Sequence, residues 1–362
     1  MVMDPSRHIV ILTDSLKPGG SERVICEMAD HWVDHGQGVT IVSLKDEPPF
    51  YKPDERVEML QLGIARESAN FVHGLANTYR RVRTLRRTLR GLNPDVVISF
   101  VADVNALTVL AVRGLAVPLI ISERNHPRAH RIPFRWRVAR RVLYPFADAM
   151  VVQTGPVADF YRQWGITPQV ISNPLRNGVD QARAPQRMIL AVGRLTRQKG
   201  FDLLLQAYAR SGLFPHWRLV VAGEGQERQR LEDLARSLGV APAVDMPGLT
   251  QHINGYLARA SMFVLSSRYE GFPNALAEAM GAGLPCISFN CPYGPGQMIH
   301  HRKNGLLVRP EDVASLARSM HELAAFPDWA TQLGRQAQKD IHRQLNKDHI
   351  MEQWQQLIER VI

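Results

Sequence analysis

The chain has 362 residues, of which 45% are hydrophobic and 22% charged, and it contains no low-complexity tract. This length and composition exclude a disordered or fibrous protein and predict two globular domains with sizeable cores. The formal net charge of +10 at pH 7 predicts an anionic partner, which could be a phosphorylated substrate, an acidic membrane face or nucleic acid.

The cysteines and the apolar segments indicate the compartment. The three cysteines, Cys26, Cys286 and Cys291, are odd in number and lack the spacing of a metal site. This predicts buried thiols in a reducing environment, with a Cys286–Cys291 disulfide as the alternative. The first apolar run, 8–13, is too short for a signal peptide, and polar residues interrupt the most membrane-like stretch, 96–122. We therefore expect a cytoplasmic protein without a spanning helix.

The first half of the chain alternates short apolar runs with amphipathic segments. The apolar runs predict buried strands at 8–13, 38–44, 95–100, 117–122 and 147–154. Segments with helical periodicity lie between them, for example at 21–35 and 72–90. This alternation is typical of a doubly wound parallel α/β sheet.

The second half repeats the alternation. Strands are expected at 187–195, 217–225, 262–267 and 284–289, each followed by a helical segment. The stretch 172–186 is rich in Asn, Gly and Pro and predicts a linker. The sequence thus predicts two Rossmann-like domains that face a cleft between the carboxyl ends of their strands. The predicted boundaries are 1–175, a linker at 176–186, 187–345, and a C-terminal helix at 346–362 that packs back on the first domain.

The segment GRLTRQKGFDLLLQA, 193–207, places Arg194 and Lys199 between an expected strand and an expected helix. Two cations at such a junction suit a diphosphate, because the first N–H groups of the helix are free and arginine binds phosphate in a fork. The segment by itself is equally compatible with a solvated basic loop.

Glycine-rich turns follow two other strands. In KPGGSER, Gly19 and Gly20 permit close approach of a ligand to a helix start, and Ser21 is a candidate cap. A plain tight turn explains this pair of glycines as well, since the full dinucleotide fingerprint is absent. The stretch VAGEGQE, 221–227, is a further turn of this kind.

The stretch RYEGFPNALAEAMGAG, 268–283, contains two acids, Glu270 before a helix that begins near Pro273, and Glu278 within it. Eight residues span ~12 Å at ~1.5 Å per helical residue, so the two carboxylates should reach different parts of one ligand. Carboxylates accept hydrogen bonds from the vicinal hydroxyls of sugars. The alternative is a surface helix with two scattered glutamates.

These motifs together resemble a known family. GGSE, GRL…KG, AGEG and EGFPNALAE are similar, in order and across essentially the whole chain, to retaining family 4 glycosyltransferases of the two-domain GT-B fold. The resemblance implies that Glu270 lies beside the donor sugar and Glu278 holds the ribose of the nucleotide. It also implies that Gly19 and Gly20 lie under the phosphates. The donor site implied for the second domain consists of Arg194, Lys199, Glu270, Gly271, Phe272, Pro273, Asn274 and Glu278.

The resemblance implies a UDP-sugar donor and transfer to an acceptor hydroxyl with retained configuration. No DxD-like strand end and no His/Cys cluster in the sequence indicates a metal, so we expect no metal or other cofactor. Arg194 and Lys199 would stabilise the leaving diphosphate electrostatically. Glu270 would position the sugar rather than act as a nucleophile. The alternatives are a UDP-sugar epimerase of the same fold and a non-catalytic protein that binds sugar nucleotides.

One position departs from the family pattern. Many relatives carry a catalytic histidine near the end of a first-domain strand, and here the corresponding stretch is ISERNHPRAH. Glu123, Arg124, Asn125 and His126 all lie in the region that corresponds to that histidine, and residue type favours His126. His126 is equally compatible with an exposed loop position.

Two basic segments lie in the first domain, which in this family usually takes the acceptor. Segment 78–90 has six arginines and no acid, and segment 124–141 has seven arginines and no acid, with Phe134 and Trp136 among them. Three interpretations stay open: a solvated helix, docking to an anionic inner leaflet with Phe134 and Trp136 at the interface, or binding of an acceptor diphosphate. Nucleic acid is not favoured, because no nucleic-acid-binding fold is recognisable. The residues concerned in the first segment are Arg80, Arg81, Arg83, Arg86, Arg87 and Arg90.

The strings PLIISERN and RRVLYPFADAM resemble a narrower group, bacterial transferases that add N-acetylgalactosamine or related hexoses to undecaprenyl-diphosphate-linked oligosaccharides. One such enzyme type has an Arg/Lys-rich first-domain helix that engages the acceptor diphosphate, and 78–90 is similar. The resemblance implies an enzyme of surface polysaccharide or glycoprotein glycan assembly, located peripherally on the inner face of the plasma membrane.

Overall fold

The computed structural model describes residues 7–65, 71–124, 133–176 and 185–362. The chain forms two compact units. The first unit contains Met1–Asn173 and Asp348–Ile362, and the second contains Pro174–Lys347. The C-terminal segment thus belongs to the first unit, and the change from one unit to the other falls just before the expected linker.

The first unit is built on a seven-stranded parallel sheet with the strand order β3-β2-β1-β4-β5-β6-β7. Its central strands are almost wholly buried, as expected for a parallel sheet covered by helices on both faces. The strands are β1 (His8–Thr13), β2 (Gly38–Ser43), β3 (Glu58–Gln61), β4 (Val96–Phe100), β5 (Leu119–Glu123), β6 (Ala149–Val152) and β7 (Gln169–Val170).

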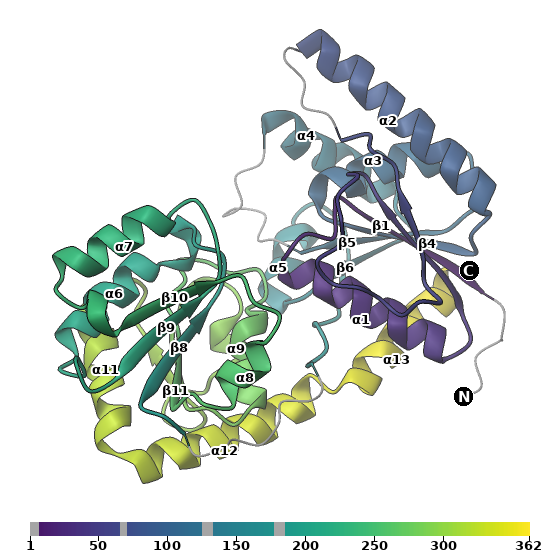
Figure 1. Ribbon diagram of the computed structural model, residues 1–362. Helices are drawn as coiled ribbons and strands as arrows, with labels where there is room; N and C mark the ends of the chain where they lie inside the picture. The colour runs from purple at the N-terminus through teal and green to yellow at the C-terminus, as the bar shows by residue number, and fades with distance from the viewer. Residues whose placement is uncertain (1–6, 66–70, 125–132, 177–184) are drawn as a thin grey trace. The chain divides into compact units, whose positions relative to one another are not determined.

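Helices cover both faces of this sheet. Figure 1 shows α2, α3 and α4 on one side of the sheet and α1 with α13 on the other. The C-terminal helix α13 packs through Trp354, whose ring meets Trp32 of α1 edge-on at 6.4 Å. The helices are α1 (Gly20–Asp34), α2 (Phe71–Leu92), α3 (Ala102–Val112), α4 (Phe134–Leu143), the 3-10 helix η1 (Tyr144–Phe146), α5 (Gly155–Arg162) and α13 (Lys347–Val361).

The second unit has a six-stranded parallel sheet with the order β10-β9-β8-β11-β12-β13. This order matches the first six strands of the other sheet, so both units have the doubly wound topology that was predicted. The strands are β8 (Met188–Val192), β9 (Arg218–Ala222), β10 (Val244–Gly248), β11 (Met262–Leu265), β12 (Cys286–Phe289) and β13 (Leu306–Val308).

Figure 1 shows α6, α7 and α11 on one side of the second sheet and α8 with α9 on the other. Leu204 and Met320 are among the fully buried side chains that fill the core between α6, α11 and the sheet. The helices are η2 (Arg197–Lys199), α6 (Phe201–Arg210), α7 (Arg228–Ser237), η3 (Ala241–Ala243), α8 (Ile253–Leu257), α9 (Asn274–Gly281), α10 (Pro295–Met298), α11 (Val313–Ala325) and α12 (Pro327–Gln344).

The fold class predicted from the sequence, two Rossmann-like α/β domains, is confirmed. In each sheet the strand order reverses between two neighbours, β1 and β4 in the first and β8 and β11 in the second. Ligands of open parallel sheets bind beyond the carboxyl ends of the strands at such a switch point. The loops that follow these strands are therefore where functional side chains are to be sought.

The cysteines and helices bear on two other expectations. All three cysteines are buried free thiols, as predicted. Among the described residues, we find no helix that combines the length and the apolar character needed to span a bilayer.

Candidate functional site

The loops after β8 and β11 bring together two residues that the sequence singled out. Lys199 is the last residue of η2, and Glu270 lies in the loop between β11 and α9. The Lys199 Nζ donates to Glu270 Oε1 at 2.7 Å, and the Ser267 hydroxyl donates to the same oxygen at 2.6 Å. Glu270 is only 4% exposed. Its charge is thus balanced and its position fixed at the switch point of the second sheet.

A glycine beside Lys199 makes this approach possible. Gly200 has a φ of +63°, and a Cβ there would lie 2.1 Å from the carbonyl oxygen of Ser266. The Ser266 hydroxyl also donates to the carbonyl oxygen of Lys199 at 2.9 Å. The two loops therefore touch through backbone, and only glycine fits between them. Sequence reasoning missed Ser266 and Ser267, although two small hydroxyl residues directly after a buried strand were a signal for them.

The turn after β9 also packs against the loop after β8. Gly223 has a φ of +154°, and a Cβ there would lie 1.9 Å from the carbonyl oxygen of Gly193. The Leu195 N–H donates to the carbonyl oxygen of Glu224 at 2.9 Å. We expected the turn glycines to admit a ligand, and at Gly223 the structure shows instead the close contact of two loops of the chain.

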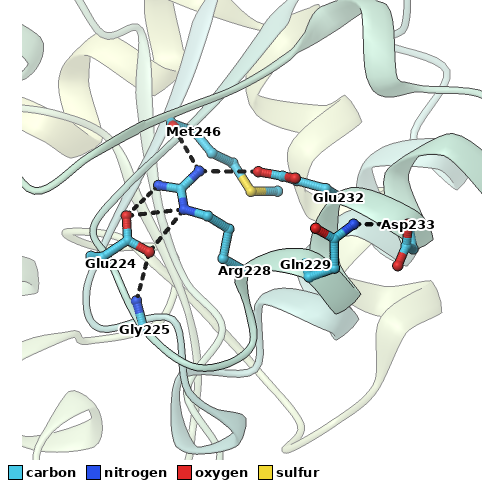
Figure 2. A network of polar contacts seen from close by, with 7 residues as sticks. All are labelled: Glu224, Gly225, Arg228, Gln229, Glu232, Asp233 and Met246. Atoms are coloured by element: carbon cyan, nitrogen blue, oxygen red, sulfur yellow. Dashed lines mark hydrogen bonds and ion pairs between the residues drawn. The ribbon is translucent and has the colours of Figure 1, made fainter.

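Figure 2 shows the side chains that hold this turn in place. The Arg228 Nη2 and Nε donate to the Glu224 carboxylate at 2.7 and 2.8 Å, while its Nη1 donates to Glu232 at 3.1 Å and to the Met246 carbonyl at 3.2 Å. The hydrogen bonds from Arg228 lower the pKa of Glu224. This network joins the turn to α7 and to strand β10.

Arg194 and Glu278 lie in the neighbouring loop and helix. Arg194 is exposed, two residues beyond the end of β8. Glu278 is half-buried inside α9. Pro273 is the N-cap of this helix and lies just before its first helical residue, Asn274. The stretch from Glu270 to Pro273 is consequently not helical. The helical rise used to estimate ~12 Å between Glu270 and Glu278 therefore applies only to the second half of that span. Gly271 and Phe272 precede the cap, and Asn274 begins α9.

In the first unit, the turn after β1 begins α1. Gly19 is the N-cap of α1 with extended backbone, and no side chain caps the helix through a hydrogen bond. The expectation that Ser21 caps the helix was therefore wrong, because Ser21 lies inside α1. Gly20, the first helical residue, is exposed. The amino end of α1 thus presents backbone N–H groups beyond a strand at the first switch point.

Glu123, the first of the four residues considered at the end of β5, belongs to a buried polar cluster. Its Oε2 accepts hydrogen bonds from the hydroxyls of Tyr144 at 3.0 Å and Tyr161 at 3.1 Å. Arg140 Nη1 lies 3.5 Å from the same oxygen, and the carboxylate is 1% exposed. Burial, reinforced by Glu123, raises the pKa of both tyrosines well above 10.0. Glu123 is therefore part of the buried polar core of the first unit.

Arg124, the next residue, is 5% exposed and has an unusual environment. Its Nη1 donates to Asn173 Oδ1 at 2.5 Å, and its guanidinium lies over the Phe100 ring at 4.4 Å. Its Nε and Nη2 are buried without a hydrogen-bond partner among the described residues. Burial lowers the pKa of Arg124 to about 9. Asn125 and His126, the predicted catalytic histidine, lie outside the described residues.

The six arginines of α2 fall into two sets. Arg81 and Arg86 hold the helix to its own unit, because their Nε atoms each donate at 3.0 Å to the carbonyl oxygens of Ile64 and Ala111 respectively. The other four are exposed. This outward set is Arg80, Arg83, Arg87 and Arg90.

The aromatic residues of the second basic segment also differ. Phe134, the first residue of α4, is 71% exposed. Trp136 packs against the core of the first unit. Of the two rings expected at a membrane interface, only Phe134 points outward.

Comparisons with known proteins agree with this architecture. The family model of the glycosyl transferase 4-like domain matches residues 19–174, and the model of glycosyl transferases group 1 matches residues 179–340. A Campylobacter jejuni relative is 29% identical over 98% of both chains. It is named as an α-1,4-N-acetyl-D-galactosaminyltransferase acting on GalNAc-α-(1→4)-GalNAc-α-(1→3)-diNAcBac-PP-undecaprenol. A second enzyme of that organism, named as a 4-α-N-acetylgalactosaminyltransferase for a diphospho-undecaprenol-linked disaccharide, is 23% identical over 84% of this chain and 87% of its own.

Solved structures show the same fold. Sucrose-phosphate synthase from Thermosynechococcus elongatus has a TM-score of 0.85 at 18% identity, with 98% of both chains covered. Anabaena HepE in complex with UDP and glucose has a TM-score of 0.82 at 18% identity, covering 98% of this chain and all of its own. The two family models follow one another along the chain, as the two sheets do. The chain belongs to the family 4 glycosyltransferases of the GT-B fold.

Proposed function

We propose that the chain is a retaining glycosyltransferase that moves a hexose or N-acetylhexosamine, with N-acetylgalactosamine favoured, from a UDP-sugar to a polyprenyl-diphosphate-linked oligosaccharide. The observation that carries the proposal is the Lys199–Glu270 pair at the switch point of the second sheet. The reaction would serve the assembly of a surface polysaccharide or a glycoprotein glycan. The names of the Campylobacter jejuni relatives support the sugar and the class of acceptor.

Lys199 and Arg194 are the residues proposed for the donor diphosphate. Breaking the bond to the anomeric carbon leaves negative charge on the diphosphate, and cations fixed beforehand stabilise that charge without reorganising. The ammonium of Lys199 is held in place by its hydrogen bond to Glu270. The side chain of Arg194 is exposed and can donate two parallel hydrogen bonds to a phosphate. These two cations would supply the charge that a metal supplies in other transferases, so we expect no metal or other cofactor. The loop segment Gly271–Phe272–Pro273–Asn274 would line the sugar beside them.

The two glutamates take different roles in this proposal. Glu270 Oε1 already accepts from Lys199 and Ser267, which lowers its nucleophilicity and fixes its orientation. We therefore assign Glu270 to holding a hydroxyl of the donor sugar while the acceptor hydroxyl attacks the anomeric carbon. Glu278 would hold the ribose. Gly19 and Gly20, at the uncapped end of α1, would lie under the phosphates, and His126 would face the sugar.

The first unit would bind the acceptor. The four outward arginines of α2 carry guanidinium groups that are suited to bidentate contact with a diphosphate. The lipid of the acceptor would keep the enzyme on the anionic inner leaflet. We thus propose a peripheral enzyme on the inner face of the plasma membrane. The structurally similar Anabaena HepE, solved in complex with UDP and glucose, supports a UDP-sugar as the donor.

The experiment that tests this function measures UDP release by purified protein across a panel of UDP-sugars, with and without a short polyprenyl-diphosphate glycan. Release that requires one sugar and the acceptor together is the expected result. Conversion of a UDP-sugar without any acceptor would favour an epimerase. Tight UDP binding with no release under any pairing would favour a non-catalytic sugar-nucleotide-binding protein. The retaining course is tested separately, by the anomeric proton coupling of the new linkage in the NMR spectrum of the product.

A further inference from the structure

Helix α4 has three apolar residues on its outward face. Phe134, Val138 and Val142 are spaced at i, i+4 and i+8, which places them on one face of the helix, and they are 71%, 44% and 56% exposed. Trp136 and Leu143, on the opposite face, pack against the core. A surface helix of a soluble domain ordinarily turns its polar face to water. The outward face of α4 therefore needs an explanation other than packing within its own unit.

A buried ion pair fixes this orientation. Arg140 lies on the inward face of α4, is 3% exposed, and has its Nη1 3.5 Å from Glu123 Oε2. The same Nη1 donates to the Tyr161 hydroxyl at 3.4 Å. Turning the apolar stripe inward would bring Arg140 out and leave Glu123 buried without its cation, which is costly. The stripe is thus held outward by the polar cluster beneath it.

Arginines border the stripe, and Phe146 extends it. Phe146, at the end of η1, is 57% exposed with the Arg113 guanidinium 4.9 Å from its ring, and Arg137 lies 5.4 Å from the ring of Phe134. Arg141, one turn after Arg137 on α4, is exposed, with its guanidinium 5.1 Å from the ring of Trp164. No Asp or Glu occurs between residues 124 and 147. The patch that we call the α4 face therefore combines apolar side chains with positive charge alone, and consists of Phe134, Arg137, Val138, Arg141, Val142, Phe146 and Arg113.

We propose that the α4 face is a membrane-docking surface that inserts its apolar side chains at the acyl boundary of an anionic bilayer while its arginines bind lipid phosphates. The exposed aliphatic and aromatic side chains suit the acyl region of a bilayer, and the arginines around them suit its anionic headgroups. The proposal rests on the proposed function in one respect, since a lipid-linked acceptor lies in the membrane and the enzyme must reach it there. It differs from the role given to α2, whose exposed residues between 79 and 90 are four arginines and one aromatic residue, Tyr79.

The positive charge of the α4 face favours an anionic bilayer over a second copy of the chain as its partner. A second copy related by a two-fold axis would present the same patch, so Arg137 and Arg141 would meet their own counterparts. Like charges facing each other at an interface oppose association. An anionic lipid surface instead supplies many phosphates over a wide area and needs no exact fit. The α4 face therefore suits lipid better than self-association.

The test is co-sedimentation of the full chain with vesicles of phosphatidylcholine mixed with phosphatidylglycerol, and with vesicles of phosphatidylcholine alone. Phe134→Ser/Val138→Ser/Val142→Ser should weaken binding to the mixed vesicles by about tenfold or more. Arg137→Gln/Arg141→Gln should weaken it by about tenfold and remove the preference for anionic lipid. The matched controls, Phe326→Ser and Arg210→Gln/Arg335→Gln, alter exposed residues of the second unit and should bind as wild type does.

UDP release with a short-chain, water-soluble diphosphate acceptor and no vesicles separates this proposal from the proposed function. Vesicle-deficient variants that keep wild-type turnover in that assay support the docking surface and also show that they are folded. Wild-type binding by the triple serine variant would overturn the proposal, as would a wild-type protein that does not bind mixed vesicles. A wild-type dimer that becomes monomeric in the triple variant would assign the face to a second copy instead. Failure of wild-type protein to turn over any donor, with vesicle binding intact, would count against the proposed function alone.

Discussion

The ammonium of Lys199 and the carboxylate of Glu270 form an ion pair, with 2.7 Å between Nζ and Oε1, although 71 residues separate them in the chain. They meet because β8 and β11 are neighbours in the sheet and the loops after both strands leave from the same edge. The pair is largely buried, with the lysine side chain 16% and the glutamate side chain 5% exposed. Its geometry leads to the first prediction.

Lys199→Ala should lower kcat/KM by about a hundredfold or more, because it removes a fixed cation from the leaving diphosphate. It should also reduce stability by about 3–5 kcal/mol, since Glu270 is left buried without a cation. Steady-state UDP release below the melting temperature and urea unfolding measure the two effects. Lys303→Ala, at an exposed lysine of the same unit, is the matched control. Unchanged kinetics in Lys199→Ala would remove Lys199 from the donor site.

Glu278→Gln should weaken UDP binding by about tenfold, because a charge-assisted hydrogen bond to a ribose hydroxyl becomes a neutral one. The loss should be the same for UDP and for the UDP-sugar, since the ribose is common to both. Isothermal titration calorimetry measures both affinities, with Glu55→Gln in the first unit as the control. A variant that binds UDP normally but loses affinity for the UDP-sugar alone would place Glu278 at the sugar instead.

The two sets of arginines in α2 should behave differently. Replacing the outward set, Arg80, Arg83, Arg87 and Arg90, by glutamine should raise the KM for the diphosphate acceptor about tenfold or more and leave UDP affinity unchanged. Replacing Arg81 and Arg86 by methionine should chiefly lower Tm, because their hydrogen bonds to Ile64 and Ala111 are lost. If both sets changed only Tm, α2 would be a structural helix without a role in acceptor binding.

Arg140→Met should destabilise the first unit by about 3–5 kcal/mol, because the carboxylate of Glu123 is left buried without a cation. Arg141→Met, at the exposed neighbour, should change stability by no more than about 0.5 kcal/mol. Adding Glu123→Gln to Arg140→Met should recover part of the loss, since the uncompensated charge is gone. Urea unfolding followed by circular dichroism measures all three. Equal stability of the two single variants would mean that the cluster does not hold α4 in place.

The buried cysteines predict a pH dependence of thiol labelling. Burial raises the pKa of Cys26 and of Cys291 to about 12, and it raises that of Cys286 further. Native protein should therefore react slowly with iodoacetamide throughout pH 7 to 9, whereas unfolded protein should react about tenfold faster per pH unit below 9.0. Neutral thiols stabilise the fold below pH 9.0, and this contribution declines as pH rises toward 12. Native labelling as fast as that of the urea-unfolded chain would contradict the burial.

The sequence predicted the inner strands of both sheets but none of their edges. The strands that it missed are β3, β7, β10 and β13, and these are the four edge strands. An inner strand of a parallel sheet is buried on both faces and reads as a continuous apolar run. β10, with the sequence VDMPG, is largely half-buried or exposed, and β7 has only two residues. β10 and β7 carry no apolar run, and the apolar run of β13, LLV, is only three residues long.

The sequence motifs placed Lys199 and Glu270 in loops after predicted strands, but they did not predict contacts between distant segments. The positions of Lys199 and Glu270 after neighbouring strands followed from the βαβ order. The packing of Gly223 on Gly193, and the burial of Glu123 against Arg140, depend on which loops and helices meet in space. The arginine spacing in α2 did not separate Arg81 and Arg86 from their outward neighbours, because helical periodicity does not say which backbone carbonyls lie nearby.

The most direct test of the proposed reaction is the mass of a synthetic polyprenyl-diphosphate glycan before and after incubation with the enzyme and UDP-N-acetylgalactosamine. We expect the acceptor to gain whole N-acetylhexosamine residues with wild-type protein and none with Lys199→Ala. An acceptor whose mass does not change with any UDP-sugar, while the wild-type protein still binds UDP, would contradict this expectation.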